Sequence, residues 1–396
     1  MPFWGRFKPK EDTRNKVLEE HYSKSLRDGV AFSLQSFGLT LLRQESARTP
    51  KENIFISPLS IFLALAMTEN AASGETKTAM RKVLALPTDA SEETVNESVI
   101  AVMKLLQSKG EADLTIANAL WSDLKLTISP DFVSTCQKIY DATVQRIDFN
   151  RPSSASTINT WVSEKTRGKI PAIVTANGIA GLAAILTNAI YFKGKFRIAF
   201  PKEATRPNAF HLSDGREKVV PMMQITGLQG SYRKGTRFEA AVLDYKESEI
   251  ALYMLLPRRG TSPEQILTEE SMQELRGVEQ SVLLDLSMPR FTIDSRCGLK
   301  ESLTPLGMGI AFQLGADFSA LGSPLFFLDE VIHVTRLEVD EEGTIASAAT
   351  AVGVALGRAR PLRVKRKTLV FDRPFAVLLR DRTTGTIVFV GVVYEP

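Results

Sequence analysis

The reactive side chains of this sequence are few and widely separated. There are three histidines, His21, His211 and His333, and two cysteines, Cys136 and Cys297. No histidine has a cysteine or carboxylate at metal-ligand spacing, and the cysteines form no CxxC pair. A serine hydrolase is not indicated, because no G-x-S-x-G turn presents a nucleophile. The residues therefore predict no metal, no cofactor and no enzyme activity.

A basic stretch near the C-terminus is the second distinctive feature. Arg358–Lys367 (RARPLRVKRK) holds six basic side chains and no acidic one. Three interpretations are open: a solvated loop, a set of cleavage sites for trypsin-like proteases, or a contact surface for a polyanion. The whole chain has 49 basic and 45 acidic residues and a formal net charge of +4, so its overall charge does not indicate nucleic-acid binding.

The chain is long enough to form one large domain of mixed structure. It has 396 residues, 44% of them hydrophobic, and no Pro/Gly/Ser-rich linker divides it. Periodicity predicts helices at 30–44, from Pro58 to Gly74, around 95–107 and from Asn159 to Gly168. Strands are predicted at 114–121, 142–149, 183–196, in a hairpin at 238–257, at 281–294, at 326–340, and in a hairpin at 375–393. This mixture predicts an α+β class.

The N-terminal segment gives an expectation about location. MPFWGRFKPKEDTRNK lacks the apolar run of a signal peptide, and no uncharged stretch is long enough to span a bilayer. We expect a cytoplasmic protein if the chain is complete, and a secreted one if a leader has been removed. Residues 1–24 are predicted to be an extension, followed by one domain over residues 25–396.

Seven separated motifs resemble those of the serpin family, and they occur in the family's order. The resemblance extends from about residue 25 to Pro396. The motifs are NIFISPLSI from Asn53, NTWVSEKTRGKI from Asn159, TNAIYFKGKF from Thr187, VPMM from Val220, LGMGIAFQLGADFSAL from Leu306, EVDEEGT from Glu338 and FDRPFAVLL from Phe371.

The resemblance implies a fold of three β-sheets and about nine helices, with an exposed reactive-centre loop over about residues 341–367. It also implies a function as a suicide-substrate inhibitor of serine proteases. In the family, the protease cuts the loop, and the loop inserts into the largest sheet while the protease is still acylated. No cofactor is implied, and the inhibitor is expected to be a monomer.

The hinge that begins this loop has a pattern suited to entering a sheet. One face of the alternating pattern is Thr344, Ala346, Ala348, Thr350, Val352, Val354 and Leu356, and the other is Ile345, Ser347, Ala349, Ala351, Gly353 and Ala355. Neither face contains a charge or a proline, so nothing obstructs insertion. The predicted hinge residues are Glu341, Glu342, Gly343, Thr344, Ala346, Ser347, Ala348, Ala349 and Thr350.

Two positions depart from the family pattern. Ile345 stands where the family usually has Glu, and Phe196 stands where it usually has Trp. Ile345 is expected to lie on the outer face after insertion, and Phe196 is expected to remain a smaller aromatic plug at the top of the sheet. Both changes predict slightly altered metastability and retained function.

Motif matching also assigns roles around the sheet. Ser57, Ser60, Asn188 and His333 correspond to the family's shutter, a hydrogen-bonded cluster that controls opening of the main sheet. His333 is therefore interpreted as a shutter residue and not as a catalyst. Arg290 and Glu341 match a salt bridge at the breach, where insertion begins, and Phe196 belongs to the same region.

Family spacing places the scissile bond about 14 or 15 residues after Gly343, at Gly357 or Arg358. Arg358 offers a charge to an acidic specificity pocket, so the predicted bond is Arg358–Ala359 and the predicted target is a trypsin-like protease. Leu356 is the alternative for a chymotrypsin-like enzyme.

The loop exceeds the usual family length within the basic stretch. We expect its charged residues to form an exosite for an acidic protease surface or a polyanion. These residues are Arg360, Arg363, Lys365, Arg366 and Lys367. Two other functions are kept as alternatives: a non-inhibitory serpin that acts as carrier or chaperone, and a polyanion-binding module.

Overall fold

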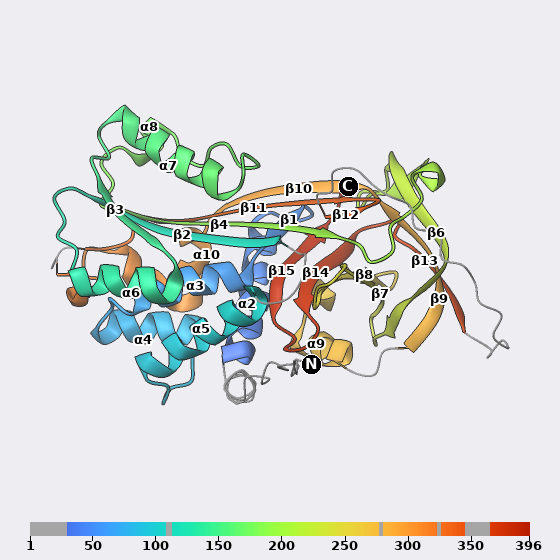
Figure 1. Ribbon diagram of the computed structural model, residues 1–396, viewed down its shortest axis with the longest axis horizontal. Coiled ribbons are helices and arrows are strands. Elements are labelled where there is room, and N and C mark those ends of the chain that lie inside the picture. The colour runs from blue at the N-terminus through green and yellow to red at the C-terminus, as the bar shows by residue number, and fades with distance from the viewer. Residues whose placement is uncertain (1–29, 108–112, 277–279, 323–325, 345–364) are drawn as a thin grey trace, which may run out of the picture.

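Two β-sheets and nine α-helices make up the described part of the chain (Figure 1). The computed structural model describes residues 30–107, 113–276, 280–322, 326–344 and 365–396. The helices are α2 Ala31–Arg48, α3 Pro58–Glu69, α4 Gly74–Val83, α5 Glu92–Gln107, α6 Pro130–Tyr140, α7 Pro152–Lys165, α8 Ala176–Ile179, α9 Glu269–Arg276 and α10 Lys300–Leu303. Short 3₁₀ or π turns lie at Lys202–Ala204, Glu264–Ile266, Thr304–Met308, Gly309–Phe312 and Ser319–Leu321.

A six-stranded sheet forms one half of the molecule. Its order is β10 Phe291–Gly298, β11 Glu330–Asp340, β12 Gly343–Thr344, β4 Ala184–Lys195, β2 Asp113–Asp123 and β3 Thr143–Ile147. Strand β12 separates β11 from β4 only at one end. Along Glu330–Arg336, β11 pairs directly and in parallel with Ile185–Tyr191 of β4. We call this direct pairing the seam.

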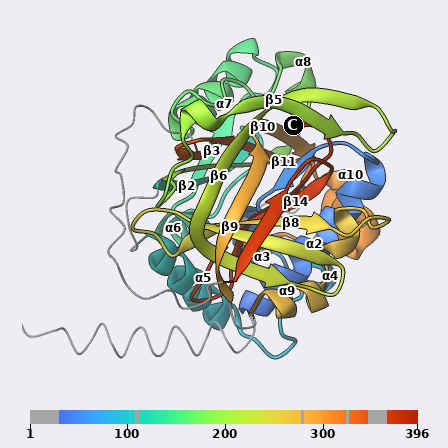
Figure 2. The same cartoon turned by 90° about the vertical axis from the view of Figure 1, so that its right-hand side faces the viewer.

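The second sheet contains nine strands. Its order is β1 Ile54–Ile56, β15 Ile387–Val393, β14 Phe375–Asp381, β8 Ile250–Pro257, β7 Phe238–Asp244, β6 Glu217–Lys234, β9 Gln280–Pro289 and β13 Arg366–Val370, with β5 Arg206–His211 paired to β6. Figure 2 shows the curved β6 beside β9. The pairing shifts between Ile225 and Leu228, where β6 bulges. Strand β9 pairs with β6 on both sides of this bulge, so the nine strands form one continuous sheet. The combination of helices and mixed sheets confirms the α+β class.

Helices cover both faces of the six-stranded sheet. In Figure 1, α7 and α8 lie on one side of it, and α3 to α6 lie on the other. Helix α3 is buried along its whole length. Pro58 fits its first turn, and the hydroxyl of Ser57 caps it by accepting the Ser60 N–H. Because α3 carries no charge before Glu69, it can occupy the core beneath the seam.

Three predicted boundaries are wrong. The helix predicted from Asn159 begins at Pro152, because proline fits the first turn of a helix. Residues 281–294 form two strands in different sheets: β9 pairs with β6, and β10 pairs with β11. The chain changes sheet at Arg290, directly after Pro289, which has no N–H to continue a ladder. The helix from Pro58 ends at Glu69, and Gly74 begins α4 with φ of 52°. Glycine suits the left-handed turn at either end of a helix, so its type alone did not decide between them.

The predicted extension over residues 1–24 and single domain over residues 25–396 remain predictions, because residues 1–29 lie outside the described part. None of the described helices has the length and apolar character needed to cross a membrane.

Candidate functional site

The first residues of the predicted reactive loop lie in the six-stranded sheet. Gly343 and Thr344 form β12, which pairs antiparallel with β11 on one side and with β4 on the other. Gly343 has φ of 145°, and a Cβ there would lie 2.2 Å from the carbonyl oxygen of Gly194. Only glycine permits this approach. We call this end of the sheet the insertion point.

Thr344 is fully buried between the two strands. Its hydroxyl forms a 2.6 Å hydrogen bond with the hydroxyl of Tyr245. Tyr245 in turn stacks on Phe196, with ring centroids 5.3 Å apart and planes at 20°, and meets Phe192 edge-on. Phe196 therefore lies at the insertion point and packs on the ring of Tyr245, which contacts Thr344 of the hinge.

Charged side chains hold the base of the loop. The guanidinium of Arg290 and the hydroxyl of Thr205 both donate to Oε1 of Glu341, at 2.5 Å and 2.6 Å. Burial alone would raise the pKa of Glu341, but these hydrogen bonds outweigh it and lower the pKa. The ion pair is therefore retained at neutral pH.

Glu342 and Asp340 complete the turn that leads into β12. Lys202 Nζ lies 2.5 Å from a carboxylate oxygen of Glu342. Asp340 accepts the backbone N–H groups of Glu342 at 2.8 Å and Gly343 at 3.1 Å. The Asp340 contacts follow a common short-range turn pattern. Sequence reasoning missed Lys202, Thr205 and Tyr245. These residues are about 100 or more positions away from the hinge in the sequence, and no motif connects them with it.

The four predicted shutter residues lie together beneath the middle of the seam. Asn188 of β4 and His333 of β11 are register partners across it. His333 Nε2 accepts the Ser57 N–H at 3.0 Å, and its Nδ1 contacts the side-chain oxygen of Asn188. The Asn188 amide donates to the carbonyl of Ser60 at 3.0 Å.

Two further groups extend this cluster. Asn118 of β2 accepts from the Asn188 amide, and the Ser57 hydroxyl donates to the carbonyl of Val388 at 2.6 Å. The cluster therefore connects β2, β4 and β11 to α3 and to β15 of the other sheet. Sequence reasoning missed Asn118, although it stands in the predicted strand 114–121.

His333 is uncharged in this environment. It is fully buried, and burial lowers its pKa to about 3. Because Nε2 accepts a backbone N–H, the imidazole proton is on Nδ1 and is donated to Asn188. Both ring nitrogens are therefore engaged, one by a backbone N–H and one by an amide side chain, and this geometry suits a structural role.

Helix α7 lies across the outer face of the seam. Its apolar side chains share a small core with Ile185 and Ala189 of β4 and with Ile332 and Val334 of β11. Trp161 of α7 meets Trp121 of β2 edge-on at 5.6 Å. If β4 separated from β11, this small core beneath α7 would be split between the two strands.

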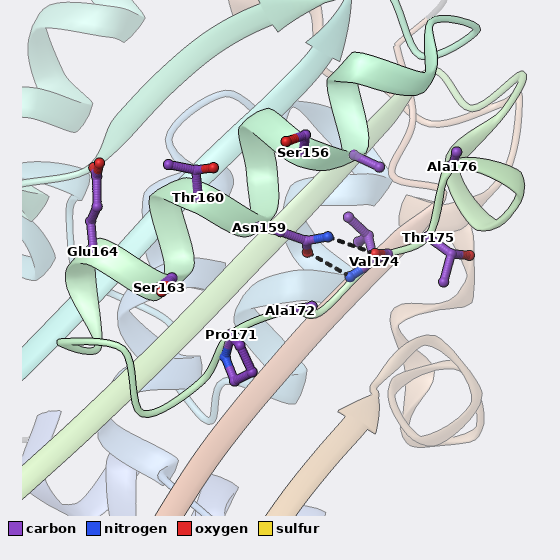
Figure 3. Close-up of a pocket in the computed structure, with 11 residues that line it drawn as sticks. Ser156, Asn159, Thr160, Ser163, Glu164, Pro171, Ala172, Val174, Thr175 and Ala176 are labelled. Carbon is purple, nitrogen blue, oxygen red and sulfur yellow. Dashed lines mark hydrogen bonds between the residues drawn. The ribbon is translucent and has the colours of Figure 1, made fainter.

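The side chain of Asn159 holds residues 171–176, a segment that runs back beneath α7. Figure 3 shows Asn159 pointing from α7 towards Val174. Its oxygen accepts the N–H groups of Ile173 and Val174, at 2.8 Å and 3.0 Å, and its amide donates to the Val174 carbonyl at 2.9 Å. A cavity of about 540 Å³ lies beside it.

This cavity gives no sign of a catalytic centre. Glu164 is its single carboxylate, and serine and threonine supply most of the other polar groups. Within the described ranges, no three His, Cys, Asp or Glu side chains are grouped to hold a metal ion.

Most predicted loop residues lie outside the described part. They are Ala346, Ser347, Ala348, Ala349 and Thr350 of the hinge, Leu356, Gly357, Arg358 and Ala359 around the predicted bond, and Arg360 and Arg363 of the predicted exosite. Ile345 also lies outside it.

Two basic residues of the predicted exosite begin β13 and have acidic partners. Arg366 binds both oxygens of Asp285, at 2.6 Å and 2.7 Å. Lys367 lies 3.7 Å from Glu239 and 4.9 Å from the centre of the Tyr232 ring. Lys365 is exposed just before the strand.

Two residues, Gly343 and Thr344, thus form a short strand between one end of β11 and one end of β4. The sequence model of the family described as "Serpin (serine protease inhibitor)" matches residues 33–396, and the chain therefore belongs to the serpin family. Its members are in general protease inhibitors and not enzymes.

Individual relatives agree with this assignment. The chain is 34% identical to antithrombin-III of Mus musculus over 366 residues, which cover 88% of this chain and 78% of that protein. The native structure of tengpin, a thermophilic serpin, is similar with a TM-score of 0.83, 30% identity, and coverage of 92% of this chain and 94% of that one. Thyroxine-binding globulin in complex with thyroxine has a TM-score of 0.82 and 26% identity, with coverage of 92% and 99%. The predicted serpin fold is confirmed.

Proposed function

We propose that this serpin is a single-use inhibitor of trypsin-like serine proteases. The observation that carries the proposal is β12, whose two residues pair with β4 and β11 at once. The loop that follows Thr344 is thus attached where a further strand would begin. Residues 344–356 contain no charge and no proline, which supports continuation of the strand between β4 and β11.

The proposed reaction begins as ordinary proteolysis. The protease serine attacks the carbonyl carbon of Arg358, the bond to Ala359 breaks, and the released amino group takes up a proton. Arg358 then remains bound to the serine as an ester. Insertion of the residues before Arg358 carries the protease along the sheet before water hydrolyses this ester.

The geometry of the seam supports a favourable insertion. The present seam is a single parallel ladder, whereas β12 is antiparallel to both neighbours. A continued strand would replace one parallel ladder by two antiparallel ones, which pair slightly better for each residue. Each added backbone hydrogen bond contributes about 1 kcal/mol net.

Incubation with trypsin tests the proposal directly. We expect a complex that survives denaturing electrophoresis and a released fragment whose first residue is Ala359. Arg358→Gln is expected to abolish the complex, whereas the matched variant Arg360→Gln retains it. A fragment beginning at Gly357, produced with chymotrypsin, would instead support Leu356 as the specificity residue.

A non-inhibitory carrier is the second candidate. The structural similarity to thyroxine-binding globulin favours this alternative. Complete cleavage by trypsin and chymotrypsin without any covalent complex would support it and exclude the inhibitory proposal.

We also propose that the basic residues at 360–367 assist recognition and that the inhibitor acts as a monomer. Arg366 and Lys367 already have acidic partners, so Arg360, Arg363 and Lys365 are the residues proposed to meet an acidic protease surface or a polyanion. Rates measured between 0.05 and about 0.5 M salt are expected to fall with salt, because exposed charges are screened. An unchanged rate would contradict the exosite, and light scattering tests the monomer.

A further inference from the structure

A second cavity lies over the seam at the end away from the insertion point. Its volume is about 410 Å³. Ile185 of β4 and Ile332 of β11 form part of its lining, together with Leu182 and with Ile179 of α8. The apolar part of the cavity therefore includes both strands that separate during insertion. A ligand in contact with both isoleucines would therefore hold β4 and β11 together.

The polar side of this cavity contains an incompletely paired carboxylate. Oε1 of Glu330 accepts the N–H groups of Lys300 and Val331, at 3.1 Å and 2.9 Å. No hydrogen bond to its Oε2 is found among the described residues. Gly298 lies beside this oxygen, and a Cβ at that position would be 3.2 Å from it. The glycine thus leaves room next to the carboxylate.

The charge of the lining favours a cation. Asp329 and Glu330 contribute two carboxylates, and Arg296 contributes one guanidinium, which leaves one negative charge in excess. Burial raises the pKa of Glu330, against the lowering effect of the Val331 and Lys300 N–H groups. A cationic donor next to Oε2 would supply a charge-assisted hydrogen bond.

We propose that this cavity binds a small amine that carries a compact apolar group, with the ammonium at Glu330 and the apolar group on Ile185 and Ile332. Such a ligand stabilises the closed seam, because it contacts β4 and β11 together. Its effect on loop insertion rests on the proposed function, whereas its binding to the intact protein does not.

Titration calorimetry on the intact chain tests the site. The probe is 1-adamantanemethylamine, and the matched ligands are the neutral 1-adamantanemethanol and the anionic 1-adamantanecarboxylate. We expect saturable binding of the amine, with the alcohol weaker by about tenfold or more, because a hydrogen bond between charged groups contributes more than a neutral one. No saturable binding, or equal binding of all three, would overturn the proposal.

Three variants locate the ligand. Glu330→Gln keeps an oxygen for the two backbone N–H groups and removes the charge, so amine affinity is expected to fall by about tenfold. Leu182→Trp is expected to fill the cavity and abolish binding. Asp294→Asn, on the exposed face of β10, is the control and is expected to bind as the unmodified chain does. Unchanged affinity in the first two variants would exclude this cavity.

The closure of β4 against β11 by the ligand is tested with protein that has been cut in its loop by a protease that forms no covalent complex with it. Its melting temperature is measured first, because a rise reports insertion of the loop. We expect the inserted form to bind the amine at least about tenfold more weakly than the intact form. Equal affinity would overturn the connection between β4 and β11. If cleavage produces no rise, the proposed function fails, and the titration of intact protein still decides the site.

Discussion

His333 shows how its surroundings determine whether a histidine acts as a catalyst or as a structural residue. Its two ring nitrogens are used by Ser57 and Asn188, and it is fully buried. Sequence reasoning predicted a non-catalytic role from the motif. The hydrogen bonds and the lowered pKa are consistent with that role, although control of sheet opening remains a prediction.

The buried imidazole predicts a loss of stability in acid. The pKa of His333 is about 3 in the folded chain against an ordinary value of 6.5, so the unfolded chain binds a proton that the native chain does not. Stability is therefore lost as pH falls below 6.5, by about 2 kcal/mol at pH 5. Urea unfolding at pH 7 and pH 5 should show a smaller pH effect in His333→Gln than in the unmodified chain. Equal pH effects in the two proteins would contradict this assignment.

Glu341 is expected to delay premature opening. Glu341→Gln weakens the contacts with Arg290 and Thr205 at the insertion point. Because Arg290 is half exposed, the native form is expected to lose about 1 kcal/mol of stability. Its conversion to an inactive relaxed form should therefore be several-fold faster. The half-life of trypsin-trapping activity at fixed temperature measures it. Arg259→Gln, an exposed arginine just after β8, is the control, and an unchanged half-life in Glu341→Gln would argue against the role.

At the scale of elements, β12 predicts the effect of a charge in the hinge. Thr344→Arg places a guanidinium where the native side chain is fully buried, at a cost of several kcal/mol. We expect this variant to be cleaved by trypsin with little covalent complex. Thr344→Val should continue to form the complex, with about 1 kcal/mol lost from the hydrogen bond to Tyr245. The moles of inhibitor consumed per mole of trypsin distinguish these outcomes, and equal values would refute insertion through this strand.

The elements differ in how well sequence predicted them. The hairpin of β7 and β8 and that of β14 and β15 were predicted, because a polar turn separates two apolar strands in each. The change of sheet at Arg290 was not predicted. Apolar residues continue on both sides of it, and periodicity reports burial without reporting which sheet provides it.

The residues of the candidate site also differ in how well the sequence predicted them. Gly343 and the Asp340 turn follow local backbone rules, and motif matching selected the shutter residues. Tyr245, Lys202 and Asn118 meet the site only because distant segments are brought together by the fold. A single sequence contains no direct record of such contacts.

At the scale of the molecule, cleavage is expected to raise stability. Insertion of about a dozen residues, each with about 1 kcal/mol of net backbone hydrogen bonding, would raise the melting temperature by about 10 °C or more for a chain of this length. Calorimetry before and after cleavage of the loop by a protease that forms no covalent complex with the chain measures the change. An unchanged melting temperature in fully cleaved protein would contradict insertion.

The edge-on pair of Trp121 and Trp161 gives the chain an internal optical probe. Trp121 also donates from its indole N–H to Thr187 of β4, at the seam, while Trp161 belongs to the helix that covers it. The sequence has one further tryptophan, Trp4, and it lies outside the described residues. Movement of α7 away from the sheet would alter the electronic coupling of the two indoles. Near-ultraviolet circular dichroism of a Trp4→Phe variant can therefore follow strand separation in real time without an attached dye.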